Sequence, residues 1–357
     1  MICVCNMLNY NYLSMNIGGG GKNVGIQYLR AICALIVYFS HYVKAVDWNP
    51  INIFRHMRWS FIVDGSIAVS VFFVLSGFFY YNTKSLTMAS YIKGLKRKAL
   101  HIYPAHIVML FIGFLLANCD FFWNTLHFTE WGNKFWNSSM TIFDFLQSAS
   151  CLFIEEAKNQ INPSAWYLEY EVWLFLIMPL IIGIVNKIGW KYSWGLLLVG
   201  LFALFTNQSM YSLVYVIAIC CMGALARYIT QRCELKFLQN KIILVLWIGV
   251  AVFLLSHVYF GVGKTYMLFR GFGAAMIIVT FWKYNFDKIP KVKWLEFLGN
   301  ISFEFYIVQH VALLAFRPLF VNPIFYLIET LILTVLASWL LNRYVTNKVL
   351  KCNINVV

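Results

Sequence analysis

Long apolar windows constrain the fold of this chain more than any other feature. About ten windows, most of them in the range of roughly 17–25 residues that a helix needs to cross a bilayer, lie near 26–46, 61–81, 99–118, 165–186, 193–206, 210–229, 242–260, 266–282, 298–316 and 323–342. Apolar residues make up 61% of the 357 residues and charged residues only 12%, which is not the composition of a soluble domain. The sequence therefore predicts an all-α, polytopic membrane bundle of about ten transmembrane helices.

The basic residues follow the loops between these windows. The formal net charge is +14, but the Lys and Arg residues do not form one patch, which argues against a nucleic-acid partner. Most of them fall on the same side of the predicted bundle, and the positive-inside rule then places both termini in the cytoplasm. We expect residues 1–24 to be a flexible lead-in, residues 25–345 to be the membrane domain and residues 346–357 to be a short cytoplasmic tail.

The cysteines and the long predicted outer loop indicate less about function than the apolar windows do about fold. The nine cysteines form no CxxC pair and no His lies at metal-ligand spacing, so the sequence predicts neither a metal site nor a tightly held cofactor. Cys119 and Cys151 are close enough in the loop of residues 119–164 to form a disulfide, although two unpaired thiols are favoured. The aromatic residues of this loop suit either an interfacial aromatic belt, which is favoured, or a sugar-stacking surface; they are Trp123, His127, Trp131 and Trp136.

Two ionisable residues lie inside the first apolar window. Arg30 and His41 are separated by about 16 Å along a helix and lie on nearly one stripe of it. A charged residue at the bilayer centre costs about 2.5–3.5 kcal/mol on insertion scales, so such residues usually line a pathway or a site. The predicted topology puts Arg30 toward the cytoplasm and His41 toward the outer leaflet. A lone His on an apolar helix is, however, more often structural than catalytic.

Further motifs follow in order along the chain. The residues that carry them are Arg30 and His41, then Phe72, Phe73, Ser76, Gly77 and Phe78, the basic segment 96–104 with His101 in place of an Arg, Trp166 to Glu171 with Pro179, and Gly299 to Tyr306. Together these segments closely resemble the acyltransferase 3 family of integral-membrane O-acyltransferases, over about residues 25–345. The His that usually follows the last motif aligns with Gln309 here, and His310 lies one position later, so no role is assigned to either residue.

The catalytic assignments combine this resemblance with the chemistry of the residues. Acyl transfer to a hydroxyl needs a base and a site that excludes water, and His41 is the natural base because an imidazole titrates near neutral pH. Either Glu169 or Glu171 could orient the imidazole of His41 or stabilise its charged form, and Glu171 is the one that matches the family pattern. Glu169 shares its depth but is equally well explained as a water-exposed carboxylate.

The donor site is expected at the cytoplasmic side. Arg30 and the cluster of Lys96, Arg97 and Lys98 suit the phosphates of coenzyme A, although the cluster is explained equally well as a topology signal. Ser76, Trp166 and Tyr306 are further binding candidates by resemblance. For Ser76 and its neighbour Gly77, close helix packing is favoured over a nucleophilic role.

The resemblance implies a function. It implies transfer of an acetyl group from cytoplasmic acetyl-CoA to a hydroxyl of a cell-surface carbohydrate or its lipid-linked precursor, in a bacterial inner membrane, with membrane lipid as the surroundings. The alternative is a multi-spanning carrier or flippase for a lipid-linked sugar, which would also place charged residues in a cavity. No pair of matching Gly- or Pro-broken halves supports it. A polysaccharide polymerase would need an Arg-rich outer loop, and residues 119–164 contain no Arg.

Overall fold

The computed structural model describes residues 23–47, 64–81, 86–119, 121, 127–152, 161–189, 213–232, 242, 244–250, 252, 265–284 and 291–354. Most of these residues are helical, and the β-structure among them is an isolated antiparallel bridge between Val46 and Phe128. The main helices are α1 (Val24–Ala45), α3 (Gly65–Tyr80), α4 (Met88–Ala117), α7 (Trp166–Ile188), α9 (Leu213–Arg232), α11 (Thr265–Lys283), α12 (Lys293–Asn300), α13 (Ser302–Phe316) and α14 (Pro323–Leu341). The predicted all-α class is confirmed.

Several helices are long and apolar enough to cross a bilayer. Among the described residues these are Val24–Ala45, Met88–Ala117, Pro163–Ile188, Leu213–Gln231 and Pro323–Cys352, and α12 with α13 forms a sixth candidate bent by 78°. The apolar helix α3 is shorter, with 16 residues. The expected window 193–206 and most of the window 242–260 lie outside the described residues. The count of about ten and the cytoplasmic termini therefore stay predictions.

Two helix boundaries differ from the apolar windows. Helix α4 begins at Met88, well before the expected 99, because Thr87 and Ser90 form a reciprocal capping box there. The basic cluster is consequently helical. The window 298–316 is broken at Ile301, where amphipathic α12 meets apolar α13 at 78°. Apolar composition alone does not detect such a break, because it continues through Ile301.

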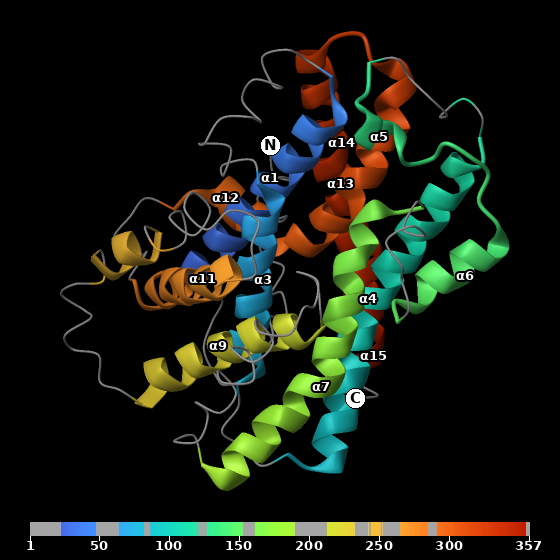
Figure 1. The fold of residues 1–357 in the computed structure, drawn as a ribbon. Helices are drawn as coiled ribbons and strands as arrows, with labels where there is room; N and C mark the ends of the chain where they lie inside the picture. The colour runs from blue at the N-terminus through green and yellow to red at the C-terminus, as the bar shows by residue number, and fades with distance from the viewer. Residues whose placement is uncertain are drawn as a thin grey trace, which may run out of the picture.

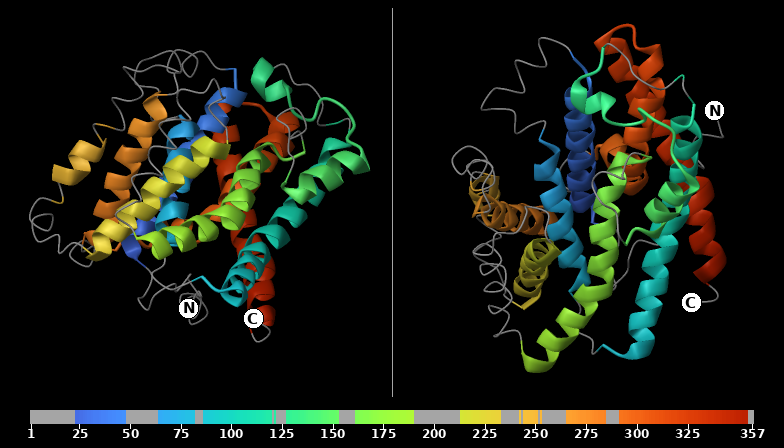
Figure 2. Two further views of the ribbon diagram at one scale, coloured as in Figure 1. Left: turned by 60° about the horizontal axis from the view of Figure 1, so that its bottom comes forward. Right: turned by 45° about the vertical axis from the view of Figure 1, so that its right-hand side comes forward.

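Figure 1 shows α1 and α3 in the middle of the molecule, with α4 and α7 on one side and α9 and α11 on the other. In the right-hand view of Figure 2, α9 and α11 run across the direction that α1, α4 and α7 share. One cluster of buried apolar side chains lies mainly between α3, α7, α9 and α11, and a second joins α1 to α13 and α14. Helix α1 therefore takes part in both clusters.

Hydroxyl groups fix the C-terminal half of α1 against α14. The hydroxyl of Tyr38 lies 2.6 Å from Oγ1 of Thr330 and donates to the carbonyl of Leu327 at 3.1 Å. One turn later, the hydroxyl of Tyr42 donates to the carbonyl of Pro323 at 2.7 Å. These bonds tie down the α1 turns on either side of His41, so the histidine is held at a fixed depth and rotation.

Helices α3 and α9 approach until their backbones touch. A Cβ atom added to Gly77 would lie 1.7 Å from the carbonyl oxygen of Cys220, and one added to Gly223 would lie 1.8 Å from that of Val74. No side chain can adopt such a contact, and small residues are the usual means by which membrane helices approach closely. The packing role expected for Gly77 is confirmed.

We predict that Gly223→Ala destabilises the protein by about 1–3 kcal/mol, because the extra methyl forces α3 and α9 apart. The measurement is thermal unfolding of the purified protein in detergent. Gly94→Ala is the matched control: Gly94 is also helical, but an added Cβ meets no atom within 4 Å, so the better helix former leaves the melting temperature unchanged or raises it. Equal melting temperatures for both variants would contradict the close contact.

Candidate active site

The imidazole rings of His41 and His310 meet between α1 and α13. Their centroids are 4.2 Å apart and the ring planes are tilted by 30°. His310 was not assigned a role from the sequence, since it lies one position after the place of the usual family His. The signal that could have found it is its helical spacing: it follows Tyr306 by one turn on α13 and so faces the same side of the bundle.

A short segment before α7 holds His310 in place. Oγ of Ser164 lies 3.3 Å from Nδ1 of His310. Asn162 positions that serine, because its amide nitrogen donates to the carbonyl of Ile307 at 3.0 Å and its oxygen accepts from the backbone N–H of Ser164 at 3.1 Å. Nε2 of His310 and Nδ1 of His41 are buried and have no hydrogen-bond partner among the described residues. Two ring nitrogens of the pair are therefore left unpaired by the described residues.

Aromatic side chains of residues 131–136 cover the two histidines. The ring of Trp131 is stacked on His41, with centroids 6.0 Å apart and an interplanar angle of 17°, and it lies 5.4 Å from His310. Phe135 approaches His310 edge-on at 5.5 Å. Trp136 is fully buried and donates from Nε1 to the carbonyl of Ile161 at 3.0 Å. The favoured interpretation as an interfacial belt is wrong for Trp136, which packs inside the protein.

Arg317 fixes this aromatic cover. Its side chain is fully buried, and its guanidinium donates to the carbonyls of Phe135 at 3.0 Å, Trp136 at 3.2 Å and Gly132 at 3.4 Å. The rigid fork of guanidinium donors suits several oxygens at once. A residue just after α13 therefore holds the loop of residues 132–136 above the histidine that α13 carries.

Glu171 lies apart from the histidine pair, in a group of residues around Arg30 that we call the Arg30 layer. Its Oε1 accepts hydrogen bonds from Oγ of Ser76 at 2.5 Å and from the hydroxyl of Tyr167 at 2.6 Å. Its carboxylate charge also acts on Arg30, as does that of Glu304. The expectation that Glu171 orients His41 is wrong, because α7 directs this carboxylate toward α3 and His41 is paired with His310 instead.

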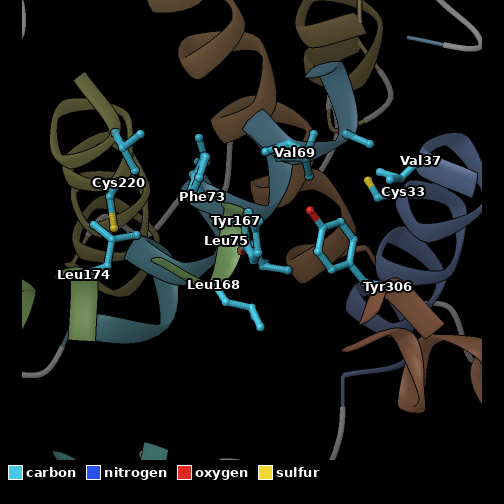
Figure 3. Packing of buried hydrophobic residues seen from close by; sticks show 14 of the residues in the cluster. Cys33, Val37, Val69, Phe73, Leu75, Tyr167, Leu168, Leu174, Cys220 and Tyr306 are labelled. Atoms are coloured by element: carbon cyan, nitrogen blue, oxygen red, sulfur yellow. The ribbon is translucent and has the colours of Figure 1, made fainter. Parts of the chain in front are cut away.

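The remaining binding candidates, Tyr306, Trp166 and Glu169, lie around the Arg30 layer. Tyr306 meets the ring of Tyr167 edge-on at 5.2 Å, and Figure 3 shows it reaching from α13 toward Cys33 and Val37 of α1 and Val69 of α3. Trp166 packs on the rings of Tyr167 and Tyr170. Glu169 is half-buried. The contacts described for Trp166 do not include the histidine pair.

The basic cluster of Lys96, Arg97 and Lys98 lies on α4. Lys96 and Arg97 are exposed, whereas Lys98 is half-buried with Nζ 5.1 Å from the centroid of the Tyr80 ring. His101 connects the two regions, since Arg30, Arg97 and Lys98 all act on it electrostatically. The structure thus places Arg30 and the basic cluster in one cationic region at the end of the bundle opposite the histidines.

A buried acid on α13 was missed by the sequence analysis. Glu304 is almost fully buried and accepts a hydrogen bond from the amide of Asn342 at 3.0 Å. Asn342 begins a π-helical turn, Asn342–Thr346, that joins α14 to α15 (Asn347–Ile354). Glu304 also acts on Arg30 electrostatically. Since Arg30 has carboxylates near it on α7 and α13, its charge is partly balanced within the bundle.

The arrangement favours general-base chemistry at the histidine pair and anion binding at the Arg30 layer. The histidine pair and the Arg30 layer are about 16 Å apart along α1. Within the described residues, no group of three or more His, Cys, Asp or Glu side chains could hold a metal ion. Cys119 and Cys151 are both unpaired thiols, as the sequence analysis favoured.

We predict that Arg317→Lys destabilises the protein by about 1–3 kcal/mol. An ammonium group cannot reach all three carbonyls, so buried acceptors are left unpaired. Trypsin cleavage after Lys134, an exposed residue in the loop that Arg317 holds, should become faster. Arg97→Lys, the same change at an exposed site, is the control. An unchanged cleavage rate at Lys134 and an unchanged melting temperature in Arg317→Lys would show that the clamp is unimportant.

Comparison with known proteins identifies the family. A sequence model described as an acyltransferase domain matches residues 23–343, which is well over half of the chain. Neither the curated proteins nor the solved structures gave a match. The matched region contains α1, α13 and the loop over the histidine pair. The chain therefore belongs to the acyltransferase 3 family.

Proposed function

We propose that this membrane acyltransferase is an O-acyltransferase that moves an acetyl group from cytoplasmic acetyl-CoA to a hydroxyl of a cell-surface carbohydrate or its lipid-linked precursor. The observation that carries the proposal is the histidine pair, whose two buried ring nitrogens without partners lie under an aromatic cover inside the membrane body. A bacterial inner membrane is the proposed location, which would give the enzyme a cytoplasmic donor and an outward-facing acceptor.

His41 is proposed as the general base. A base must lie within hydrogen-bond reach of the acceptor hydroxyl and carry an unoccupied lone pair, and Nδ1 of His41 has no partner among the described residues. Two imidazolium charges with ring centroids 4.2 Å apart would repel each other in a buried site. The pair therefore accommodates one additional proton, and His310, held by Ser164, acts as the positioning residue for His41.

The aromatic cover supports water exclusion. Acetyl-CoA is a thioester, and water that reached the base would compete with the acceptor hydroxyl. Trp131 and Phe135 pack directly on the two imidazoles, and Arg317 holds the segment that carries Phe135. We propose that the acceptor enters beside this cover.

The cationic region is proposed as the donor site. Arg30, Lys96, Arg97 and Lys98 provide guanidinium and ammonium groups for the phosphates of coenzyme A, and the exposure of Lys96 and Arg97 leaves these two able to bind a soluble donor. The pantetheine arm would then extend about 16 Å along α1 to the histidines. On this route we propose that it passes the layer of Ser76, Glu171 and Tyr306, with Trp166 and Glu169 at its edge.

The direct test is transfer of radiolabelled acetyl from acetyl-CoA into base-labile carbohydrate by membranes that carry the protein. We expect His41→Gln, which keeps a polar side chain, to lower the transfer rate by about 10²–10⁴-fold, the usual contribution of a general base. The control is His127→Gln, since His127 stacks on Phe320 in the outer loop and takes no part in the proposed chemistry. Equal label in wild type and His41→Gln would exclude His41 as the base, and no label with wild type would favour the carrier.

A second prediction concerns the donor end. We expect Arg30→Met to raise KM for acetyl-CoA by about 10- to 100-fold, since a charge-assisted hydrogen bond contributes about 1.5–3 kcal/mol, with a smaller change in kcat. Lys96→Met should act in the same direction but more weakly, because exposed charges are screened. Lys93→Met, one helical turn away and also exposed, is the control. Unchanged KM in Arg30→Met would overturn the assignment of the donor site.

A further inference from the structure

Gln309 is an anomalous residue in α13. Its side chain is fully buried, and both Oε1 and Nε2 lack a hydrogen-bond partner among the described residues. A carboxamide offers two donor hydrogens and an acceptor oxygen, and leaving such groups buried and unpaired costs about 1–3 kcal/mol each. Buried polar groups are almost always paired, so an exception calls for a missing partner such as a bound molecule. A purely structural role in packing would be better filled by an apolar residue.

The helix places Gln309 on the side of α13 that faces α1. Phe305, one turn earlier and on the same side, contacts the ring of Tyr38 with centroids 5.9 Å apart. The next residue, His310, contacts His41. Gln309 thus lies between two residues that contact consecutive turns of α1, at the depth of the histidine pair.

We infer that the carboxamide of Gln309 is the oxyanion donor of the acyl-transfer site, an inference that rests on the proposed function. In acyl transfer the carbonyl oxygen of the thioester gains negative charge as the nucleophile attacks. A donor fixed in a site shielded from water stabilises that charge. An amide N–H suits the task because it is neutral and does not compete with His41 for the proton.

The step balances with the residues present. The acceptor hydroxyl oxygen forms a bond to the thioester carbon while His41 takes the hydroxyl proton. The carbonyl oxygen becomes an oxyanion that accepts a hydrogen bond from Nε2 of Gln309. The carbonyl then re-forms, the carbon–sulfur bond breaks, and the coenzyme A thiolate receives the proton from His41. The products are the acetyl ester and the coenzyme A thiol, and no redox partner is needed.

The test is Gln309→Met, which keeps the length of the side chain and removes its polar atoms. We expect kcat for transfer from acetyl-CoA to fall by about 10²–10³-fold, the usual loss of one oxyanion donor, with KM for acetyl-CoA changed by less than about threefold. The melting temperature in detergent should stay equal or rise, because an unpaired buried amide has been removed.

The control is Gln27→Met. Gln27 is also buried with an unpaired Oε1, but it lies near the opposite end of α1 from His41, so its kcat should match wild type. If Gln309→Met keeps kcat within about threefold, or loses kcat and melting temperature together, the inference is overturned while the proposed function stands. If wild type transfers no acetyl group from acetyl-CoA, the proposed function and the inference fail together.

Discussion

The cost of an unpaired polar group inside a membrane protein governs this structure. Hydrogen bonds and ion pairs satisfy many of the buried polar groups. Arg317 donates to three carbonyls, Arg270 pairs with Asp64 at 3.3 Å, and the hydroxyl of Tyr38 donates to a carbonyl of α14. Other buried polar atoms also lack partners elsewhere in the described part of the chain, but those of His41, Gln309 and His310 lie together on the facing sides of α1 and α13. Because such atoms are expensive in this surrounding, their convergence marks the place where a bound molecule would supply the missing partners.

Close packing makes this arrangement possible. The tyrosine hydroxyls of α1 fix its rotation against α14. Gly77 faces the backbone of Cys220 and Gly223 faces that of Val74, so α3 and α9 pack closely together. The Arg317 clamp then holds the aromatic cover above the histidines. Each of these interactions fixes the position of a ring, a loop or a helix, so the site depends on packing between several elements.

Several features followed from the sequence with few assumptions. Apolar length predicts helices, and α1, α7 and α14 begin and end within a few residues of their windows, because an apolar stretch in a bilayer must pair its own backbone groups. The break at Ile301 and the early start of α4 were not predicted, since a cap and a bend depend on single polar residues and on neighbouring helices.

The sequence by itself determined the membrane class and the family. It also predicted Arg30 and His41 as site residues, because an ionisable residue inside an apolar helix is visible without any tertiary contact. Only the tertiary structure decided the partners. In the folded protein His41 contacts His310, and Glu171 binds Ser76 and Tyr167. Glu304 lies near Arg30, and Gln309 is unpaired beside the histidines. The physical reason is that these residues lie on different helices, and the rotation of each helix about its axis, which chooses the neighbour of every side chain, is set by packing between helices.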